Sequence, residues 1–480
     1  MGKAKKYIIV IVSLIAIEPC FGQGTNNHSL DDYLEMAAEN NPGLKTTFIR
    51  YLAALEKVPQ AGSLPDPQAT FGYFIKPMEL SGGNQIADIQ FMQMFPWFGT
   101  LKASKDEASQ MAKAEYEAFN AAKAELFYKV KSGWYRLMKS DREIALVSET
   151  IEMLESLEKL ALIKFQSPVT DASTPAMQER NTAINSSTGA MNNSGGGMGG
   201  MNNQQRSANP METASASSGG MSSGMNTSQT GLQDLFRAKM EILEQQNKLV
   251  LLYDQRKTEE VALNALLNRD LETPVQISDS LAIQPLPADK SAIADTILNN
   301  SPMLAMLENE SGAYAFMEQK AKKMGLPMLG VGLNYMLIRE RAGNTSMMNG
   351  NDMIMPMISI SIPVYRKKYN AMQNEARLMQ EAGNLQIIDL RNNLMVLKRQ
   401  LIQGLDDAER RIVLYKEQED LARRTTDLLL AGFATTGNNY EEVLRMQIRV
   451  LDYGFKYIEA IVDYNIAAAM AENLMNSVKY

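Results

Sequence analysis

Residues 101–165 read LKASKDEASQMAKAEYEAFNAAKAELFYKVKSGWYRLMKSDREIALVSETIEMLESLEKLALIKF, a segment that has no proline and a single glycine, Gly133. Its many Ala, Glu, Lys and Leu residues favour one continuous helix. At about 1.5 Å per residue this helix would be roughly 100 Å long, whereas helices of globular domains usually have about three turns. A compact domain cannot enclose such a helix, so the segment predicts an extended protein.

The apolar residues of this segment form two heptad rows, displaced from each other by three residues. One row contains Val130, Leu137, Ile144 and Ile151, and the other contains Val147, Leu154 and Ala161. Two rows with a period of 3.5 residues are typical of a coiled-coil face. The long helix therefore needs at least one partner helix.

The composition excludes several classes of function. Among 480 residues there are one cysteine and one histidine, and the net charge is −7. Nucleic-acid binding requires clustered Lys and Arg, and this acidic chain shows no such cluster. The glycines of residues 195–200 follow no strand and begin no helix, so they do not predict a phosphate loop. We expect no enzyme activity, no cofactor and no nucleic-acid partner.

Residues 1–22 have the features of a secretory signal peptide: a basic start, a short apolar core and small residues before Gln23. Cys20 could instead be the lipidated first residue of the mature chain, although Glu18 and Pro19 stand where a lipoprotein signal has small residues. Beyond this segment no apolar run approaches the roughly 20 residues of a membrane helix. The expected product is periplasmic, extracellular, or a β-barrel in an outer membrane.

The first half of the mature chain, residues 23–270, predicts helices and one strand hairpin. Helices are expected at residues 30–39 and 43–60, and strands at 68–75 and 85–95 with a loop at 77–84. The hairpin 68–95 is long enough to cross a bilayer. After the long helix 100–165, residues 166–230 are rich in Ser, Asn, Gly and Met and predict a disordered insertion. A helix returns at 232–267.

The second half repeats this order after a linker at residues 271–290. Asn41-Pro42 recurs as Ser301-Pro302, and the strand end at Pro96 recurs at Pro363. The second repeat, residues 291–480, predicts a hairpin at 328–362, a long helix at 369–431, a tip at 432–440 and a returning helix at 441–476. Four strands cannot close a barrel, since about eight is the practical minimum, so closure requires an oligomer.

These features together resemble the TolC-like outer-membrane efflux family. The resemblance rests on Asn40-Asn41-Pro42, residues 61–67, the junctions at Pro96 and Pro363, the duplication, and Gly437 followed by residues 440–444. It covers the mature chain except the insertion. The fold it implies is mainly α with a β-barrel portion: antiparallel coiled-coil helices form an α-helical tunnel in the periplasm, and a homotrimer closes a 12-stranded barrel in outer-membrane lipid.

The resemblance also implies partners and a function. Members of the family are exit ducts of tripartite pumps or of type I secretion systems, and they work with a periplasmic adaptor protein and an inner-membrane pump, here expected to be of the RND type. The substrates would be small toxic solutes such as drugs or metal cations. A fibrous coiled-coil surface protein or adhesin is the alternative, but such a stalk has no need for four amphipathic strands.

The helical turns contain the candidate entrance residues. Under threefold symmetry the acidic Asp234, Glu441 and Glu442 would form rings that attract cations. Acidic residues are also common in the first turn of any helix, where they complement the helix dipole. The turns themselves are expected at Gly231 in the first half and at Gly437 and Tyr440 in the second.

Arginines near these turns are candidates for a latch that keeps the entrance shut, a role that the family resemblance implies. Arg237 and Arg445 occupy equivalent positions in the two halves, and Arg423 and Arg424 precede the second tip by two to three turns. Charges on the flank of a coiled coil usually form weak, exposed pairs, so a structural role is the competing interpretation.

Methionine is unusually frequent, with 33 residues. The candidates for a metal site are Met191, Met198 and Met201 in the insertion, and Met353, Met355 and Met357 in a strand. Thioethers are soft ligands that favour Cu(I), which makes copper or silver a hypothesis for the substrate. Replacement of Leu by Met in apolar positions is the alternative explanation. The alternating residues 353, 355 and 357 share one face of the strand, and whether that face meets lipid is left open.

Overall fold

The computed structural model describes residues 29–166, 227–277, 280–286, 289–343, 347, 349–436 and 440–476. The helices are α2 (Leu30–Asn40), α3 (Pro42–Gly62), α4 (Thr100–Gln166), α5 (Thr227–Leu267), α6 (Lys290–Asn300), α7 (Pro302–Met324), α8 (Arg366–Thr436) and α9 (Tyr440–Met475), and the strands are β1 (Gln68–Leu80), β2 (Gly83–Phe95), β3 (Met328–Arg339) and β4 (Met353–Ser361). The order of two helices, two strands, a long helix and a further helix therefore occurs twice. The signal segment and nearly all of the insertion lie outside the described residues.

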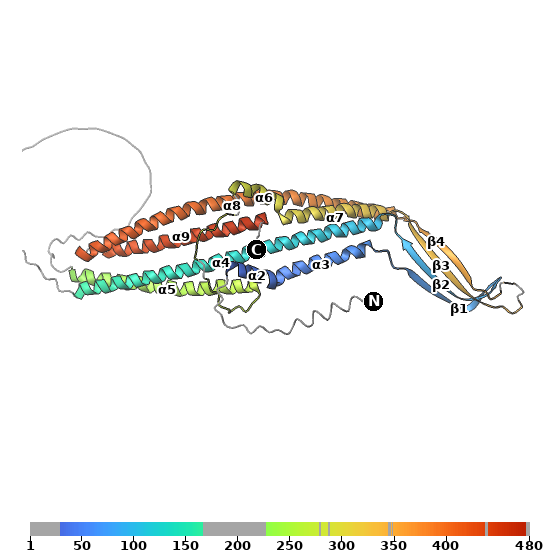
Figure 1. The fold of residues 1–480 in the computed structure, drawn as a ribbon, viewed down its shortest axis with the longest axis horizontal. Coiled ribbons are helices and arrows are strands. Elements are labelled where there is room, and N and C mark those ends of the chain that lie inside the picture. The colour runs from blue at the N-terminus through green and yellow to red at the C-terminus, as the bar shows by residue number, and fades with distance from the viewer. Residues whose placement is uncertain are drawn as a thin grey trace, which may run out of the picture.

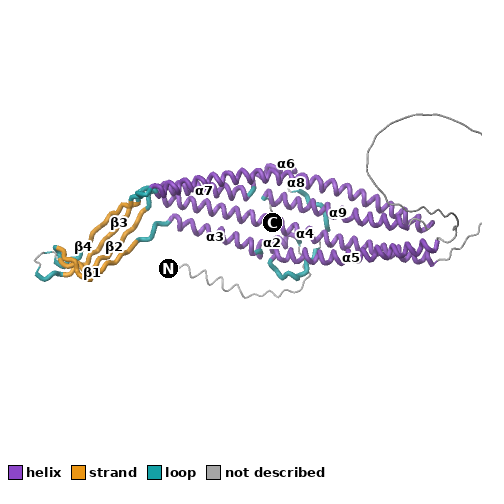
Figure 2. The backbone as a smooth tube through the Cα atoms, turned by 180° about the vertical axis from the view of Figure 1, so that it is seen from behind, coloured by secondary structure: helices purple, strands orange, loops and turns teal. Residues whose placement is uncertain are grey.

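The molecule is a long rod with helices along most of its length and the sheet at one end (Figure 1). Helices α4 and α8 run the length of the helical part, paired with α5 and α9 toward the far end and with α3 and α7 toward the sheet (Figure 2). The mainly helical architecture with a small antiparallel sheet agrees with the expected fold class. No helix among the described residues is both long and apolar enough to cross a membrane.

Short capping motifs start equivalent helices in both halves. Ser29 and Asp32 form a reciprocal capping box at α2. The Asn41 side chain accepts a hydrogen bond from the Leu44 amide at the start of α3, and Ser301 accepts one from the Leu304 amide at the start of α7. A proline follows each of these two caps, at the position where a missing N–H costs nothing. These local signals explain why the helix starts were predictable.

The heptad rows of α4 form the seams of the helical bundle. Val130, Leu137, Val147 and Leu154 are completely buried, and Ile151 and Ala161 nearly so. Three core clusters along the rod combine residues of α4 with residues of α5 or α9, and a fourth consists of residues of α6, α7, α8 and α9. Separate clusters are what a rod requires, since it has no single centre in which to gather its apolar side chains.

The linker expected at residues 271–290 contacts the middle of the rod where it is described. The Asn465 side chain on α9 accepts a hydrogen bond from the Gln284 amide and donates one to the Ala282 carbonyl, each 2.9 Å long. Asn264 on α5 donates to the Leu271 and Thr273 carbonyls. Both asparagines are buried, so these bonds secure the linker to two helices.

The expected loop at residues 77–84 is wrong. Strand β1 continues to Leu80, and only Ser81 and Gly82 lie between it and β2. A register shift between Tyr73 and Met78 accommodates Pro77. Proline is tolerated there because the pairing of β1 with β2 is interrupted between Tyr73 and Met78, so the missing N–H breaks no hydrogen bond to β2.

The four strands form one antiparallel sheet in chain order, with β1 and β4 at its edges. The register separates two faces of different chemistry. The apolar face contains Phe71, Ile89, Phe91, Leu333, Val331, Ile354, Ile358 and Ile360; the polar face contains Thr70, Asp88, Gln90, Asn334 and Ser359 together with methionines. Ile358 is 81% exposed and Phe71 69% exposed. A large apolar surface is therefore open on one side of the sheet.

Candidate functional site

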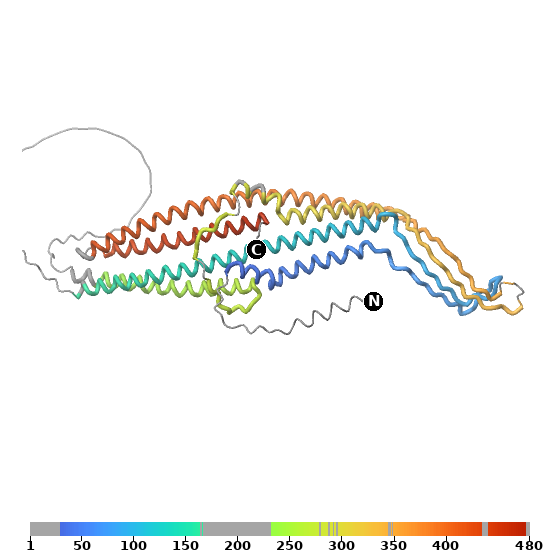
Figure 3. Tube along the Cα trace, in the orientation of Figure 1, coloured from blue at the N-terminus to red at the C-terminus, as the bar shows by residue number. Residues whose placement is uncertain are grey.

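The far end of the rod, opposite the sheet, brings together four helix ends. The last turns of α4 and α8 lie beside the first turns of α5 and α9 (Figure 3). This region, here called the tip, contains most of the candidate entrance residues. They are far apart in the sequence, and only the antiparallel pairing of the long helices makes them neighbours.

An apolar cluster fills the interior of the tip. It consists of Leu154, Leu157, Ala161, Ala238, Ile242, Phe433, Tyr440, Val443 and Leu444. The rings of Phe433 on α8 and Tyr440 on α9 have centroids 5.2 Å apart. All four helices contribute, so the tip is a packed unit that positions the charged residues on its surface.

Glu441 is the centre of a charged chain across the tip surface. One of its carboxylate oxygens is 2.9 Å from Arg237 Nη1 on α5, and the other is 2.9 Å from Arg445 Nη2 one turn along α9. Arg445 also lies 3.7 Å from Glu442. These side chains are about half exposed, so each pair contributes at most about 1 kcal/mol to folding. These ion pairs link α5 to α9 but contribute little to the stability of the fold.

Asp234 and Tyr440 are the two tip residues with shifted titration. Burial raises the pKa of the Asp234 carboxyl, Arg237 opposes the shift and Glu441 adds to it. Burial raises the pKa of Tyr440 to about 12, with further contributions from Asp234 and Glu158. The Tyr440 hydroxyl is buried and has no hydrogen-bond partner in the described part of the chain. The tip therefore contains a neutral phenol in a mostly apolar interior beside acidic groups.

The structure places the remaining candidates of the tip elsewhere. Gly231 lies inside α5, which begins at Thr227, so its expectation as a turn residue is wrong; one glycine costs only about 1 kcal/mol in a helix interior. Arg423 pairs with Glu419 on its own helix at 2.7 Å. Arg424 is exposed and forms no ion pair among the described residues. Gly437 lies outside the described residues.

The turn between α8 and α9 is shorter than the expected tip at residues 432–440. Helix α8 continues to Thr436, five residues beyond the predicted end at residue 431, and α9 begins at Tyr440. The extension places Phe433 where it is 3% exposed against the tip cluster. Burial of this ring is a tertiary contact that a heptad pattern read along one helix does not contain.

The strand methionines lie on the polar face of the sheet. Met353, Met355 and Met357 share that face with Asn334 and Ser359, and the intervening isoleucines of β4 lie on the apolar face. The structure thus assigns the methionine row to the polar face of the sheet. Met191, Met198 and Met201 lie outside the described residues. Among the residues that the structure describes, no three His, Cys, Asp or Glu side chains are placed to bind a metal ion.

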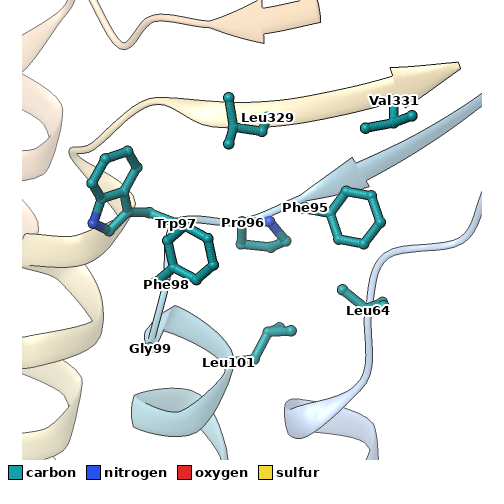
Figure 4. Close-up of a pocket in the computed structure, with 9 residues that line it drawn as sticks. All are labelled: Leu64, Phe95, Pro96, Trp97, Phe98, Gly99, Leu101, Leu329 and Val331. Carbon is teal, nitrogen blue, oxygen red and sulfur yellow. The ribbon is translucent and has the colours of Figure 1, made fainter. Parts of the chain in front are cut away.

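An apolar cavity of about 340 Å³ lies where the sheet meets the helices. Leu64, Phe95, Trp97 and Leu101 line it together with Leu329 and Val331 of β3 (Figure 4). Phe98 and Tyr365, at the ends of the two hairpins, are more than 80% exposed. Aromatic side chains thus gather at the junction, around the boundary between the apolar sheet face and the charged helices.

Sequence reasoning missed two methionines, Met92 and Met94, that lie on the same polar face in β2. The alternation in residues 91–95, FMQMF, was the available signal, since residues two apart in a strand share a face. It also missed Glu143, which is 7% exposed among α4, α5 and α9. A glutamate within a charged helix looks like a surface residue until the neighbouring helices are placed.

Comparison with known proteins supports the architecture. No family model and no curated protein matches the sequence. Among solved structures, the outer-membrane channel OprN aligns with a TM-score of 0.64 at 12% identity over 94% of this chain and 90% of that one. The outer membrane protein VceC of Vibrio cholerae gives 0.63 at 13% identity, over 93% and 95%. The open-state MtrE outer membrane channel of Neisseria gonorrhoeae gives 0.63 at 14% identity, over 93% and 88%. The chain therefore has the fold of TolC-like outer-membrane channels, as its sequence resemblance implied.

Proposed function

We propose that this protein is the outer-membrane exit duct of a tripartite efflux system. Three chains would contribute four strands each to a 12-stranded barrel, and their long helices would form a tunnel in the periplasm. The observation that most supports this proposal is the sheet at the end of the helical rod, which has one apolar face, one polar face and two open edges. The substrates would be small toxic solutes, and a partner would supply the energy.

The sheet supports a membrane position. Its apolar face is exposed in the single chain, and exposed apolar surface of this extent calls for lipid or another protein. Its polar face would then line the lumen, which matches the alternation of outer-membrane strands. The edges at β1 and β4 would pair with neighbouring chains, because an unpaired edge in a bilayer leaves backbone groups without hydrogen bonds.

The tip supports an entrance at the opposite end of the duct. Asp234, Glu441 and Glu442 would form acidic rings there, with Arg237 holding α5 to α9 and Arg445 orienting Glu441 on α9. Arg423 and Arg424 would flank the entrance on α8. A periplasmic adaptor protein and an inner-membrane pump of the RND type are the partners we propose for this end. The adhesin alternative accounts for the coiled coils but not for the sheet.

Disulfide trapping of the closed barrel tests the proposal. Cysteines introduced at Thr70 on β1 and, one at a time, at positions 355, 357 and 359 on β4 should cross-link neighbouring chains into a covalent trimer in outer-membrane fractions. A cysteine pair on the helices, at Glu56 and Lys416, is the matched control and should not cross-link. The purified protein should conduct ions across planar bilayers. A water-soluble dimer without conductance would contradict the proposal.

A further inference from the structure

Two methionine sulfurs converge on one hydroxyl on the polar face of the sheet. Ser359 Oγ on β4 lies 3.5 Å from Met92 Sδ and 3.9 Å from Met94 Sδ, both on β2. Strand β3 separates β2 from β4, so the methionine side chains reach across an entire strand. They can do so only if the strand between them has no side chain in the way.

Glycines of β3 provide this space. A Cβ atom at Gly330 would lie 2.2 Å from Ser359 Oγ, 2.8 Å from Met94 Sδ and 3.1 Å from Met92 Sδ. A Cβ atom at Gly332 would lie 3.1 Å from Met92 Sδ. Any other residue at these two positions would displace the sulfurs. The two glycines thus leave room for the two thioethers and the hydroxyl to lie together.

Further donor side chains lie next to the two sulfurs and the hydroxyl. Gly332 pairs with Met92 on one side and with Met357 on the other, so the two methionines flank the missing side chain on the same face. Asn334 is the next residue of β3 on this face after Gly332. It is 9% exposed, and its Oδ1 atom has no hydrogen-bond partner among the described residues. A buried amide oxygen without a partner is costly, and a bound cation would satisfy it.

The surroundings disfavour a mere packing role for these methionines. Methionine that replaces leucine in a core is surrounded by apolar side chains. Here the neighbours on the face are Gln90, Asn334 and Ser359, while the opposite face of the same strands holds the isoleucines and phenylalanines. The thioethers therefore stand among polar groups, where their ligand chemistry is available.

We propose that Met92, Met94 and Met357, with the Ser359 hydroxyl and the Asn334 amide oxygen, bind a soft monovalent cation, Ag⁺ or Cu⁺. Neutral thioethers bind such ions and discriminate against Zn²⁺, Mg²⁺ and K⁺. Neutral ligands suit a singly charged ion that must also be released. The binding itself needs only the sheet; a role in export rests on the proposed duct, in which this face lines the lumen.

The test is equilibrium Ag⁺ binding to the purified full-length protein in detergent, in chloride-free buffer, with bound silver counted per chain. The variant Met92→Leu/Met94→Leu keeps side-chain volume and should lose one tightly bound Ag⁺ per chain. Met357→Leu alone should weaken that site at least tenfold. The control Met240→Leu/Met379→Leu removes two exposed methionines of the helices and should retain the site. X-ray absorption at the silver edge should show sulfur neighbours that disappear with the first variant.

Equal silver binding by all variants would overturn the proposal, and so would equal affinity for Zn²⁺ or K⁺. Folding is checked on the same samples by circular dichroism, which Met92→Leu/Met94→Leu should leave unchanged. Trimer formation and ion conductance are measured on the unaltered protein and on the Met240→Leu/Met379→Leu control. Loss of silver with the fold retained supports the site, whereas absence of trimer and conductance in the unaltered protein refutes the duct and leaves the binding measurement intact.

Discussion

At the scale of single residues, Tyr440 combines a large buried ring with a hydroxyl that has no hydrogen-bond partner among the described residues. The ring packs against Phe433 in the tip cluster, and the side chain is 2% exposed. Burying a hydroxyl without a hydrogen bond offsets part of the gain from burying the ring. The phenol therefore weakens the folded tip relative to a purely apolar residue of the same shape. Tyr440 is also the first residue of α9, the helix that carries Glu441.

The substitution Tyr440→Phe should leave the stability of the purified trimer unchanged or raise it, because it removes an unsatisfied buried group. Tyr440→Ala should cost about 3–5 kcal/mol through the cavity it leaves. Thermal unfolding followed by circular dichroism compares the two. A clear loss of stability in Tyr440→Phe would mean that the hydroxyl has a partner in the assembled protein.

Glu441 offers a second test at this scale, because one carboxylate joins two arginines. Glu441→Gln should change stability by no more than about 1 kcal/mol per exposed pair. Under the proposed gating role it should nonetheless raise single-channel conductance, since it frees Arg237 on the neighbouring helix. Glu442→Gln is the control and should have a smaller effect, because the Glu442 carboxylate lies 3.7 Å from Arg445 and forms no ion pair with the described residues of α5. Equal conductance in all three proteins would argue against a latch.

At the scale of elements, the packing of α4 against α5 and α9 encloses a glutamate. Burial raises the pKa of the Glu143 carboxyl, Lys139 and Lys248 oppose the shift, and Glu459 on α9 adds to it. Lys139 Nζ lies 3.7 Å from Glu143 and 4.0 Å from Glu459, so one ammonium serves two carboxylates. The charge is incompletely compensated where three long helices meet.

A raised carboxyl pKa in the folded state means that the folded protein binds the Glu143 proton more tightly than the unfolded chain. The ionised side chain therefore destabilises the fold above its folded pKa, and this penalty disappears as the pH falls below the ordinary value of 4.5. Glu143→Gln should raise the melting temperature at neutral pH and have little effect well below pH 4.5. Glu149→Gln, an exposed change on the same helix, is the control. A destabilising Glu143→Gln at neutral pH would show that the ion pairs outweigh burial.

At the scale of the whole molecule, the sheet is the part that a single chain leaves incomplete. The helical rod has its own buried seams, whereas the sheet has two open edges and an exposed apolar face. Three or more antiparallel strands need a covered apolar face to be stable. Assembly of several chains in lipid would pair the strand edges and cover the apolar face at the same time. We therefore expect insertion and oligomerisation of this protein to be coupled.

The variant Ile358→Lys tests this coupling. Ile358 is 81% exposed in the single chain, so a soluble protein would tolerate lysine there. On the lipid face of a barrel the same change costs up to about 2–4 kcal/mol, and the heat-labile trimer in outer-membrane fractions should decrease. Ser361→Lys, at an exposed position on the polar face of the same strand, is the matched control and should assemble. Equal assembly of both would contradict the proposed orientation of the sheet.

Much of the architecture followed from short-range patterns. Three patterns were sufficient: heptad rows such as Val130 and Leu137, the prolines at 42 and 302, and the alternation of residues in strands. Each depends only on the periodicity and backbone geometry of a short stretch of chain. The same patterns located Glu441 in the first turn of its helix, whereas Asp234 lies two turns inside α5, which begins at Thr227 and not at residue 232 as expected. They could not place Gly231, because a glycine that ends one helix is tolerated inside another when the chain around it continues to form hydrogen bonds.

The tertiary structure was needed wherever distant segments had to be brought into register. Glu441 meets Arg237 because two long helices return to the same end of the rod, and Met92 and Met94 meet Ser359 because β2 and β4 flank glycines of β3. A strand shifted by one residue would exchange its two faces, so no local pattern reveals which side chains meet. The sequence determined that the chain is a duplicated rod with four amphipathic strands; strand pairing and helix packing decided which residues meet at its two ends.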